Sequence, residues 1–200
     1  TVSDQPAQER LGRMLRVTQR LRRISESLLD FARPRSQEMT PVAVGPVIDE
    51  AWSLVEIDEK ASSVHFVNNV SRDHIVIGDA DRLVQVFVNL LRNSLSAVKP
   101  GGHIWVSSSR YLVENAPWIS ISVEDDGPGI PPDVLPQIFE AFVTTRLDAR
   151  GTGLGLAVAE GIIHQHGGRI EAANRPQGGA RLEVQLPASA PARRSGGEHS

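Results

Sequence analysis

Residues 118–130 read Trp-Ile-Ser-Ile-Ser-Val-Glu-Asp-Asp-Gly-Pro-Gly-Ile, and this stretch decides the fold class of the chain. Its first part, Trp118–Glu124, predicts a buried strand. Asp125 ends that strand, and Gly127 and Gly129 follow. Glycine permits unusual backbone angles and lets a flat ligand approach the main chain. A carboxylate in such a pocket accepts a hydrogen bond from an exocyclic amine, which distinguishes adenine from hypoxanthine; an ordinary Asp-Gly turn is the alternative.

The segments on either side of this stretch predict helices interspersed with hairpin-like strands. The expected helices are 46–60, 83–98 and 155–166, and the other expected strands are 64–70, 75–77, 103–109, 169–173 and 180–186. Asp79 or Asp81 suits the N-cap of the second helix. Helices layered on a mixed sheet follow from this order, so the sequence predicts an α+β fold.

A glycine-rich loop, Gly151-Thr152-Gly153-Leu154-Gly155-Leu156, comes directly before the last helix. Backbone amides at a helix N-terminus bind phosphate. The loop is not the dinucleotide pattern, because Leu156 stands where a third glycine is required, and no Gly-Lys-Ser/Thr of a Walker A loop follows. The loop therefore indicates phosphate binding, with a flexible hinge as the alternative.

Three amides lie at i, i+4 and i+8 in the expected helix 83–98: Gln85, Asn89 and Asn93. This spacing places them on one helix face. Burying an amide is costly unless its groups are bonded, and neutral oxygen donors suit Mg²⁺, which relies largely on phosphates and water. A polar surface stripe is the alternative to a metal site.

Two aromatic residues, Phe139 and Phe142, precede a polar stretch, Thr144–Gly151. We expect the two rings to anchor the chain. The polar stretch lacks apolar residues for packing and ends in glycine, so it is a candidate lid over a ligand. Arg146 and Arg150 are placed to reach phosphates from such a lid.

The N-terminal region predicts a helix with one apolar stripe. The stripe follows a strict 3-4-3-4-3 spacing through Met14, Val17, Leu21, Ile24, Leu28 and Phe31. This is the seam of a coiled coil, and Pro34 ends it. A lone helix cannot bury the stripe, so we expect a helical hairpin or dimeric bundle, with docking on the following domain as the alternative. Eight arginines against Glu26 and Asp30 make residues 10–35 basic, which indicates a solvated face or an acidic partner.

Composition excludes several classes of protein. The 200 residues contain no cysteine, so a disulfide framework, a thiolate zinc site and a cysteine nucleophile are excluded. The formal net charge of −3 gives no basic field for nucleic acid. No apolar run approaches the roughly 20 residues of a membrane span. We expect a soluble protein or the soluble piece of a longer one.

Four motifs in this order resemble the ATP-binding domain of sensor histidine kinases, within the gyrase, Hsp90, histidine kinase and MutL type of fold. The N, G1, F and G2 boxes of that family are matched by Asn89-Leu-Leu-Arg-Asn93, Asp125-Asp-Gly127-Pro-Gly129, Phe139-Glu-Ala-Phe142 and Gly151-Thr-Gly153-Leu-Gly155-Leu156. The resemblance runs from about residue 42 to 187. It implies a two-layer α/β sandwich, the Bergerat-type ATP-binding fold, preceded by a coiled-coil-like helix.

The resemblance implies that Asp125 accepts from the adenine amino group, while Gly127, Gly129 and Ile130 form the wall of the adenine pocket. One departure concerns the last strand, where the family often has a threonine near the adenine carboxylate. Ala180 stands there in this chain. Alanine has no hydroxyl for a water-mediated contact to adenine, and the resemblance implies nucleotide binding without that contact.

The resemblance also implies the metal and phosphate positions. Asn89 is expected to ligate Mg²⁺, and Asn93 to contact both phosphate and metal. The further ATP-binding positions that it implies are Phe142, Thr145, Arg146, Gly151, Thr152, Gly153, Leu154, Gly155 and Leu156. The cofactors implied are ATP and Mg²⁺.

The larger departure concerns the phosphoacceptor, which in the family is a histidine on the first helix of the hairpin. The histidines of this chain are His65, His74, His103, His164, His166 and His199, so none lies in residues 1–45. We expect a truncated chain without that first helix rather than a natural protein lacking the acceptor. The histidines at 65, 74 and 103 are expected to be structural, and the one at 166 to suit the helix macrodipole.

These inferences predict four segments: 1–35 as the second helix of a dimerisation and phosphotransfer hairpin, 36–45 as linker, 46–187 as the catalytic domain and 188–200 as a disordered tail. The resemblance implies transfer of a phosphoryl group from Mg-ATP to histidine, then to an aspartate of a response regulator receiver domain. It also implies self-association through the N-terminal helix, no nucleic acid, no membrane contact by this chain, and a cytoplasmic location, with an inner-membrane anchor of a parent protein left open. An ATPase or a regulatory scaffold of the same fold is the alternative.

Overall fold

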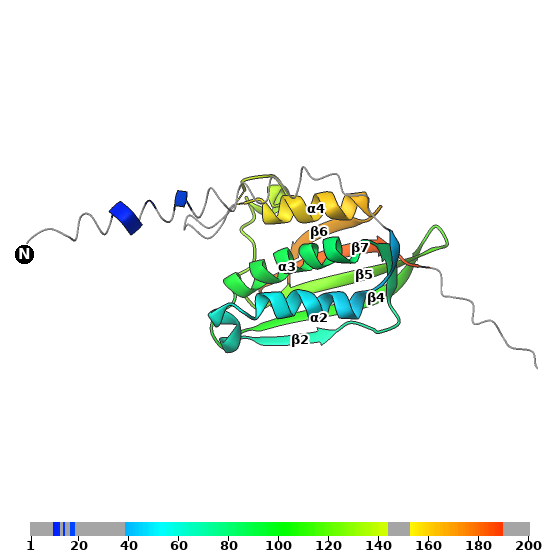
Figure 1. Ribbon diagram of the computed structural model, residues 1–200, viewed down its shortest axis with the longest axis horizontal. Helices are drawn as coiled ribbons and strands as arrows, with labels where there is room; N and C mark the ends of the chain where they lie inside the picture. The colour runs from blue at the N-terminus through cyan, green and yellow to red at the C-terminus, as the bar shows by residue number, and fades with distance from the viewer. Residues whose placement is uncertain (1–9, 13, 15–16, 19–38, 144–152, 190–200) are drawn as a thin grey trace, which may run out of the picture.

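The computed structural model describes residues 10–12, 14, 17–18, 39–143 and 153–189, and its main body is a sheet covered on one face by helices (Figure 1). The five-stranded sheet has the order β2-β4-β5-β7-β6. Its strands are β2 (His65–Asn69), β4 (His103–Val113), β5 (Ala116–Asp125), β6 (Arg169–Asn174) and β7 (Ala180–Pro187). Strands β2 and β4 pair in parallel and the other neighbours pair antiparallel, so the sheet is mixed as expected.

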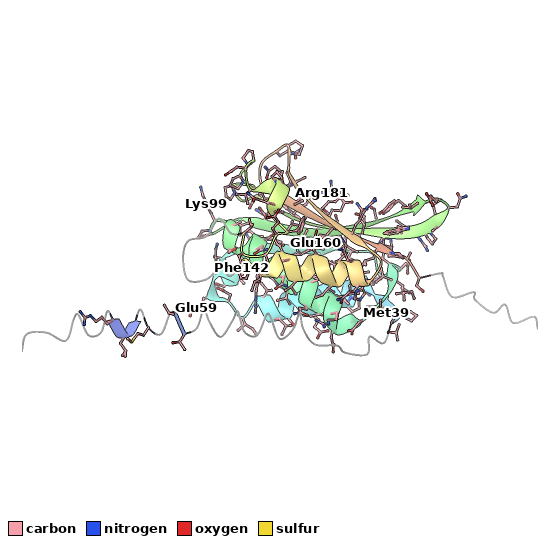
Figure 2. The ribbon with its side chains drawn as sticks, turned by 90° about the horizontal axis from the view of Figure 1, so that it is seen from above. Met39, Glu59, Lys99, Phe142, Glu160 and Arg181 are labelled. Atoms are coloured by element: carbon pink, nitrogen blue, oxygen red, sulfur yellow. The ribbon has the colours of Figure 1, made fainter. Side chains whose placement is uncertain are left out.

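Three helices form the second layer: α2 (Val44–Val55), α3 (Ala80–Ala97) and α4 (Gly155–Gln165). Helix α3 lies between the other two, and its fully buried Leu90 and Leu91 join a core that includes Ile121 of β5 and Val184 of β7. Figure 2 shows the helical layer, with Glu160 on α4, on one side of the sheet and Arg181 on the other. This arrangement confirms the two-layer α+β fold.

Local capping explains where α3 begins. Asp79 is its N-cap, and the Asp79 carboxylate accepts from the backbone N–H of Arg82 at 3.2 Å. Of the two expected caps, Asp79 is therefore the one used, while Asp81 lies in the first turn. Two short 3₁₀ helices, η1 (Glu59–Ser63) and η2 (Leu135–Gln137), complete the described elements. In the described part of the chain, no helix combines the length and apolar character needed to cross a membrane.

The domain begins earlier than the sequence indicated. Thr40–Ala43, expected to be linker, form β1, which pairs antiparallel with β3 (Ile75–Gly78) in a separate two-stranded sheet. The first residues of the expected tail are also ordered, because Ser189 donates its backbone N–H to Ile75 at 2.8 Å. A segment of four residues that includes Pro41 is too short to show a periodic pattern. It becomes a strand only through pairing with β3, which is distant in the sequence. The rest of the two terminal predictions falls on residues 1–9, 13, 15–16, 19–38 and 190–200, which lie outside the described part; these include Leu21, Ile24, Leu28 and Phe31 of the expected apolar stripe.

His166 ties the end of α4 to the start of α3. Its ring is buried, and Nε2 accepts from the backbone N–H of Asp79 at 3.0 Å. The proton must therefore be on Nδ1, which donates to the carbonyl of Ile162 at 2.7 Å. Gly78 leaves room for the ring, because a Cβ there would lie 2.8 Å from it. His166 is the C-cap residue of α4, at the helix end where it was expected, and its ring also links α4 to the start of α3.

We predict that His166→Leu lowers the free energy of unfolding by about 1–3 kcal/mol, because the part-buried Asp79 N–H loses its acceptor, while the Ile162 carbonyl keeps only the backbone N–H of residue 166. Urea denaturation measures this change. His164→Leu, at an exposed position of the same helix, is the control and is expected within about 0.5 kcal/mol of the parent. Equal effects of the two substitutions would refute the role given to His166.

The surroundings of His74 favour the neutral form of its ring. Its Nδ1 lies 2.7 Å from Ser108 Oγ. Burial lowers the pKa of His74 below its ordinary value, and Arg110 lowers it further, while Asp73 opposes both effects. A depressed histidine pKa gives stability that is present above the unfolded-state pKa of about 6.5 and is lost as pH falls through the folded-state value.

We predict that the free energy of unfolding decreases on acidification below about pH 6.5, and that His74→Gln makes this decrease shallower. Urea denaturation at several pH values between about 7 and 5 measures the two slopes. His164→Gln serves as the control. Parallel slopes for the parent and His74→Gln would show that His74 carries none of the dependence.

Candidate functional site

Asp125 is the buried carboxylate of the candidate site. It ends the central strand β5 and is 3% exposed. Its Oδ1 accepts two backbone hydrogen bonds, from Gly127 N–H at 2.9 Å and from Ala180 N–H at 3.2 Å. Among the described residues no donor reaches Oδ2. One carboxylate oxygen is thus fixed by the main chain and the other is left to accept from a ligand.

Asp126, the next residue, faces a different way and has a different partner. Its Oδ1 accepts from the backbone N–H of His103 at 2.9 Å, and its Oδ2 lies 3.1 Å from His103 Nδ1. Partial burial raises the pKa of Asp126, but the hydrogen bonds from His103 outweigh it and hold the pKa below its ordinary value. The two adjacent carboxylates therefore have separate partners, and of the two only Asp125 is buried.

Glycines let neighbouring backbones approach this carboxylate. A Cβ on Gly127 would lie 3.1 Å from the Cβ of Ala97 on α3. A Cβ on Gly179, which has φ +92°, would lie 1.8 Å from the carbonyl oxygen of Asp125. Gly179 is not among the residues predicted from the sequence, although the pair Gly178-Gly179 directly before the last strand is a signal for a close approach of two backbones.

Helix α3 brings the glycine-rich loop and the Asp125 loop together. The Asn89 Nδ2 donates to the carbonyl of Gly155 at 3.0 Å, at the start of α4. Asn89, Asn93 and Ala97 share one face of α3 at i, i+4 and i+8, and Ala97 meets Gly127. Asn93 consequently lies between the two loops. The third amide of the predicted stripe, Gln85, instead accepts from Arg82 at 3.2 Å.

The loop before α4 is described from Gly153 onward. Leu154 is buried, and Gly155 and Leu156 begin the helix, where the first N–H groups have no acceptor within the helix. These amides and the positive end of the helix favour an anion. Gly153 has φ +69°, and its carbonyl accepts from Phe142 N–H at 2.9 Å. The F and G2 boxes are therefore adjacent in space.

The prediction that both phenylalanine rings anchor the chain is correct for Phe139 and wrong for Phe142. Phe139 packs against the core, but Phe142 is 63% exposed and has φ +70°. Its backbone, which is pressed against Gly153, rather than its ring connects it to the site. Figure 2 shows Phe142 near the start of α4. The predicted residues Thr145, Arg146, Arg150, Gly151 and Thr152 lie outside the described part.

Comparison with known proteins identifies the arrangement. Residues 78–190 match the family described as histidine kinase-, DNA gyrase B- and HSP90-like ATPase. The sensor histidine kinase ZraS of Escherichia coli O157:H7 is 36% identical over 176 residues, 87% of this chain and 37% of that protein. The chain thus spans little more than a third of that relative.

Two solved structures are similar to this fold. The histidine kinase ThkA, solved in a complex with the response regulator protein TrrA, has a TM-score of 0.73 at 26% identity. The match covers 94% of this chain and 53% of the ThkA chain. Full-length ShkA, solved in a complex with AMPPNP, has a TM-score of 0.68 at 25% identity. The match covers 83% of this chain and 35% of the ShkA chain. The chain therefore belongs to the histidine kinase-, DNA gyrase B- and HSP90-like ATPase family, and the relatives that it matches are sensor histidine kinases.

Proposed function

We propose that this domain binds Mg-ATP and presents the γ-phosphoryl group to a histidine side chain, for relay to an aspartate of a response regulator. The observation that carries the proposal is the carboxylate of Asp125, buried, fixed at Oδ1 by two main-chain donors and open at Oδ2. An exocyclic amine of adenine is the donor that Oδ2 can accept from, whereas the oxygen of hypoxanthine at the same ring position cannot donate. Gly127, Gly129 and Ile130 continue from Asp125 as the wall of the purine pocket.

The neighbouring groups suit a magnesium-bound triphosphate. The amides of Leu154–Leu156 at the start of α4 favour phosphate oxygens, and the side-chain oxygens of Asn89 and Asn93 are neutral ligands of the kind that Mg²⁺ accepts. When bound, Mg²⁺ neutralises charge on the phosphates. Within the described residues no cluster of three or more His, Cys, Asp or Glu side chains offers a dedicated metal site. The donor set therefore fits an ion held largely through the nucleotide.

The chemistry favoured is transfer rather than hydrolysis. An ATPase needs a base to activate water, and Asn89 has no basic form; its Nδ2 already donates to Gly155. Transfer of a phosphoryl group depends chiefly on positioning and on neutralising charge. In the transfer, the bond from the γ-phosphorus to the bridging oxygen breaks, an N–P bond to the imidazole forms, and ADP leaves.

Residues 1–35 are proposed as the second helix of a dimerisation and phosphotransfer hairpin. Residues 10–12, 14 and 17–18 have helical backbone, and the side chains of Met14 and Val17 are 67% and 53% exposed. An apolar stripe left exposed needs a partner helix. A second copy of the chain is the proposed partner there, and a receiver domain is the proposed recipient of the phosphoryl group, since ThkA was solved with a response regulator.

We predict that Asp125→Asn weakens ATP binding by about 1–3 kcal/mol. The carboxylate is replaced by a neutral amide, whose NH₂ group cannot accept a hydrogen bond from the adenine amine. Isothermal titration calorimetry with Mg-ATP measures the change. Asp126→Asn, which alters the neighbouring carboxylate, is the matched control and should bind as the parent does. Unchanged affinity in Asp125→Asn would sink the adenine assignment.

We further predict that the chain hydrolyses ATP very slowly and acquires no acid-labile label from radiolabelled ATP by itself, but labels a separately supplied hairpin that carries an acceptor histidine. Asn89→Ala should reduce this labelling strongly, since it removes a ligand of the metal–phosphate unit. Label on the chain alone, or rapid release of free phosphate, would contradict the proposal. An unlabelled hairpin in the presence of tight ATP binding would favour a regulatory scaffold instead.

A further inference from the structure

Two residues where β6 ends and the turn to β7 begins, Asn174 and Arg175, form hydrogen bonds with residues 125–130. Asn174, at the end of β6, uses its side-chain amide to form a pair of hydrogen bonds with Ile130: Oδ1 accepts from the Ile130 N–H at 2.7 Å, and Nδ2 donates to the Ile130 carbonyl at 2.8 Å. The amide thus imitates a neighbouring strand. A Cβ on Gly129, which has φ +81°, would lie 2.7 Å from Asn174 Oδ1, so the loop passes directly against this side chain.

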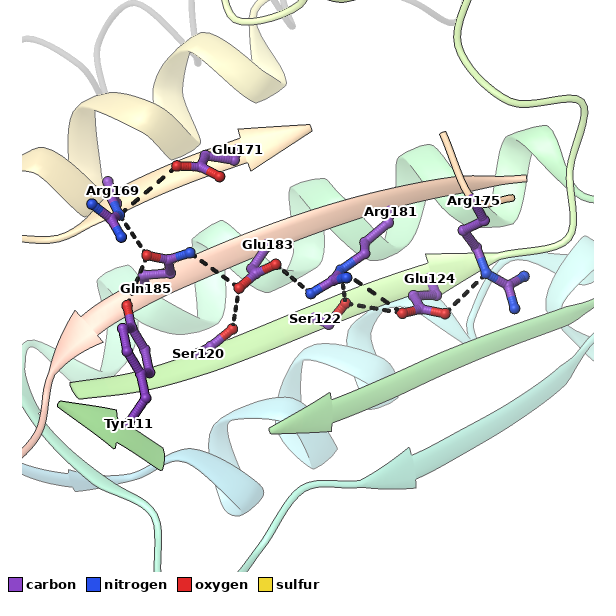
Figure 3. A network of polar contacts seen from close by, with 10 residues as sticks. All are labelled: Tyr111, Ser120, Ser122, Glu124, Arg169, Glu171, Arg175, Arg181, Glu183 and Gln185. Carbon is purple, nitrogen blue, oxygen red and sulfur yellow. Dashed lines mark hydrogen bonds and ion pairs between the residues drawn. The ribbon is translucent and has the colours of Figure 1, made fainter. Parts of the chain in front are cut away.

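Arg175, the next residue, holds the other end of the same loop. Its Nη1 donates to the backbone carbonyl of Asp125 at 2.9 Å. The guanidinium is held in place by Glu124, whose Oε2 lies 2.9 Å from Nε, and by the face of Trp105, with 4.7 Å to the ring centroid. Figure 3 shows Arg175 and Glu124 side by side on the outer face of the sheet. Its side chain is half-buried, so this ion pair is partly shielded from water.

We propose that Asn174 and Arg175 are positioning residues for adenine recognition, which act on the nucleotide through the backbone of residues 125–130. This inference rests on the proposed function. The loop contains two glycines, which lose more conformational freedom on ordering than other residues do. A loop fixed before the ligand arrives spares binding that entropic cost. Asn174 and Arg175 hold both ends of the loop, so that Asp125 Oδ2 has one orientation.

The chain offers a matched control in Arg181. It lies on the same outer face, donates to Ser122 at 3.1 Å and pairs with Glu183 and more distantly with Glu124. In the described part of the chain, none of its contacts reaches residues 125–130. Arg181→Met therefore removes a comparable surface ion pair without touching the loop.

The test compares ATP with ITP, whose hypoxanthine lacks the exocyclic amine. The full chain and its variants Asn174→Asp, Arg175→Met and Arg181→Met are titrated with both Mg-nucleotides, and their melting temperatures are recorded. We expect Asn174→Asp and Arg175→Met to weaken ATP roughly tenfold, the size of one lost hydrogen bond to a charged group, while ITP changes by less than about twofold. The preference for ATP over ITP then falls in these two variants and is retained in Arg181→Met.

A structural role alone would weaken both nucleotides equally, so an unchanged ATP-to-ITP ratio overturns the inference. Where a variant fails to fold, hydrogen exchange of the Ile130 amide in the parent decides: slow exchange without nucleotide supports a preset loop, and fast exchange refutes it. If the parent binds neither nucleotide, both this inference and the proposed function fail. If the parent prefers ATP and the two variants match it, only the inference about Asn174 and Arg175 fails.

Discussion

The burial of the Asp125 carboxylate is the constraint on which the rest of the site depends. A charged group away from water is costly unless it is hydrogen-bonded. Two main-chain donors meet that need at Oδ1, and one of them, Ala180 N–H, comes from the neighbouring strand β7. This is possible because β5 is the central strand, with β4 and β7 on either side. It also explains Gly179, since any side chain there would collide with the Asp125 carbonyl.

Helix α3 sets the distance between the two halves of the site. Asn89 bonds to the start of α4, and Ala97 touches Gly127 two turns further along the same face. Phe87, Leu90 and Leu91 of α3 are fully buried in the core and fix the helix against the sheet. The spacing between the Asp125 carboxylate, proposed to accept from the base, and the amides at the start of α4, proposed to bind phosphate, is thus a property of one helix. His166 adds to this by joining the end of α4 to the cap of α3.

The sequence predicted the parts of the site that lie within single segments. Asp125, Gly127, Asn89 and Gly155 were identified because each lies in a short motif on a strongly periodic element. Contacts between distant segments left no such signal: Asn174 meets Ile130 across 44 positions, and Arg175 meets Asp125 across 50. The strand Thr40–Ala43 was missed for the same reason, since it depends on β3. The exposure of Phe142 also depends on the tertiary structure, because aromatic residues are usually buried.

Polar side chains on the outer face of the sheet also connect to the candidate site. Its polar side chains form a continuous series, drawn in Figure 3, from Tyr111 and Gln185 through Glu183 and Arg181 to Glu124 and Arg175. Exposed ion pairs contribute little to stability, so the energetic value of this series is small. Its last pair matters for the geometry of the site, because Glu124 Oε2 lies 2.9 Å from Nε of Arg175. The series ends at the carbonyl of Asp125, where a fixed guanidinium limits how the buried carboxylate can turn.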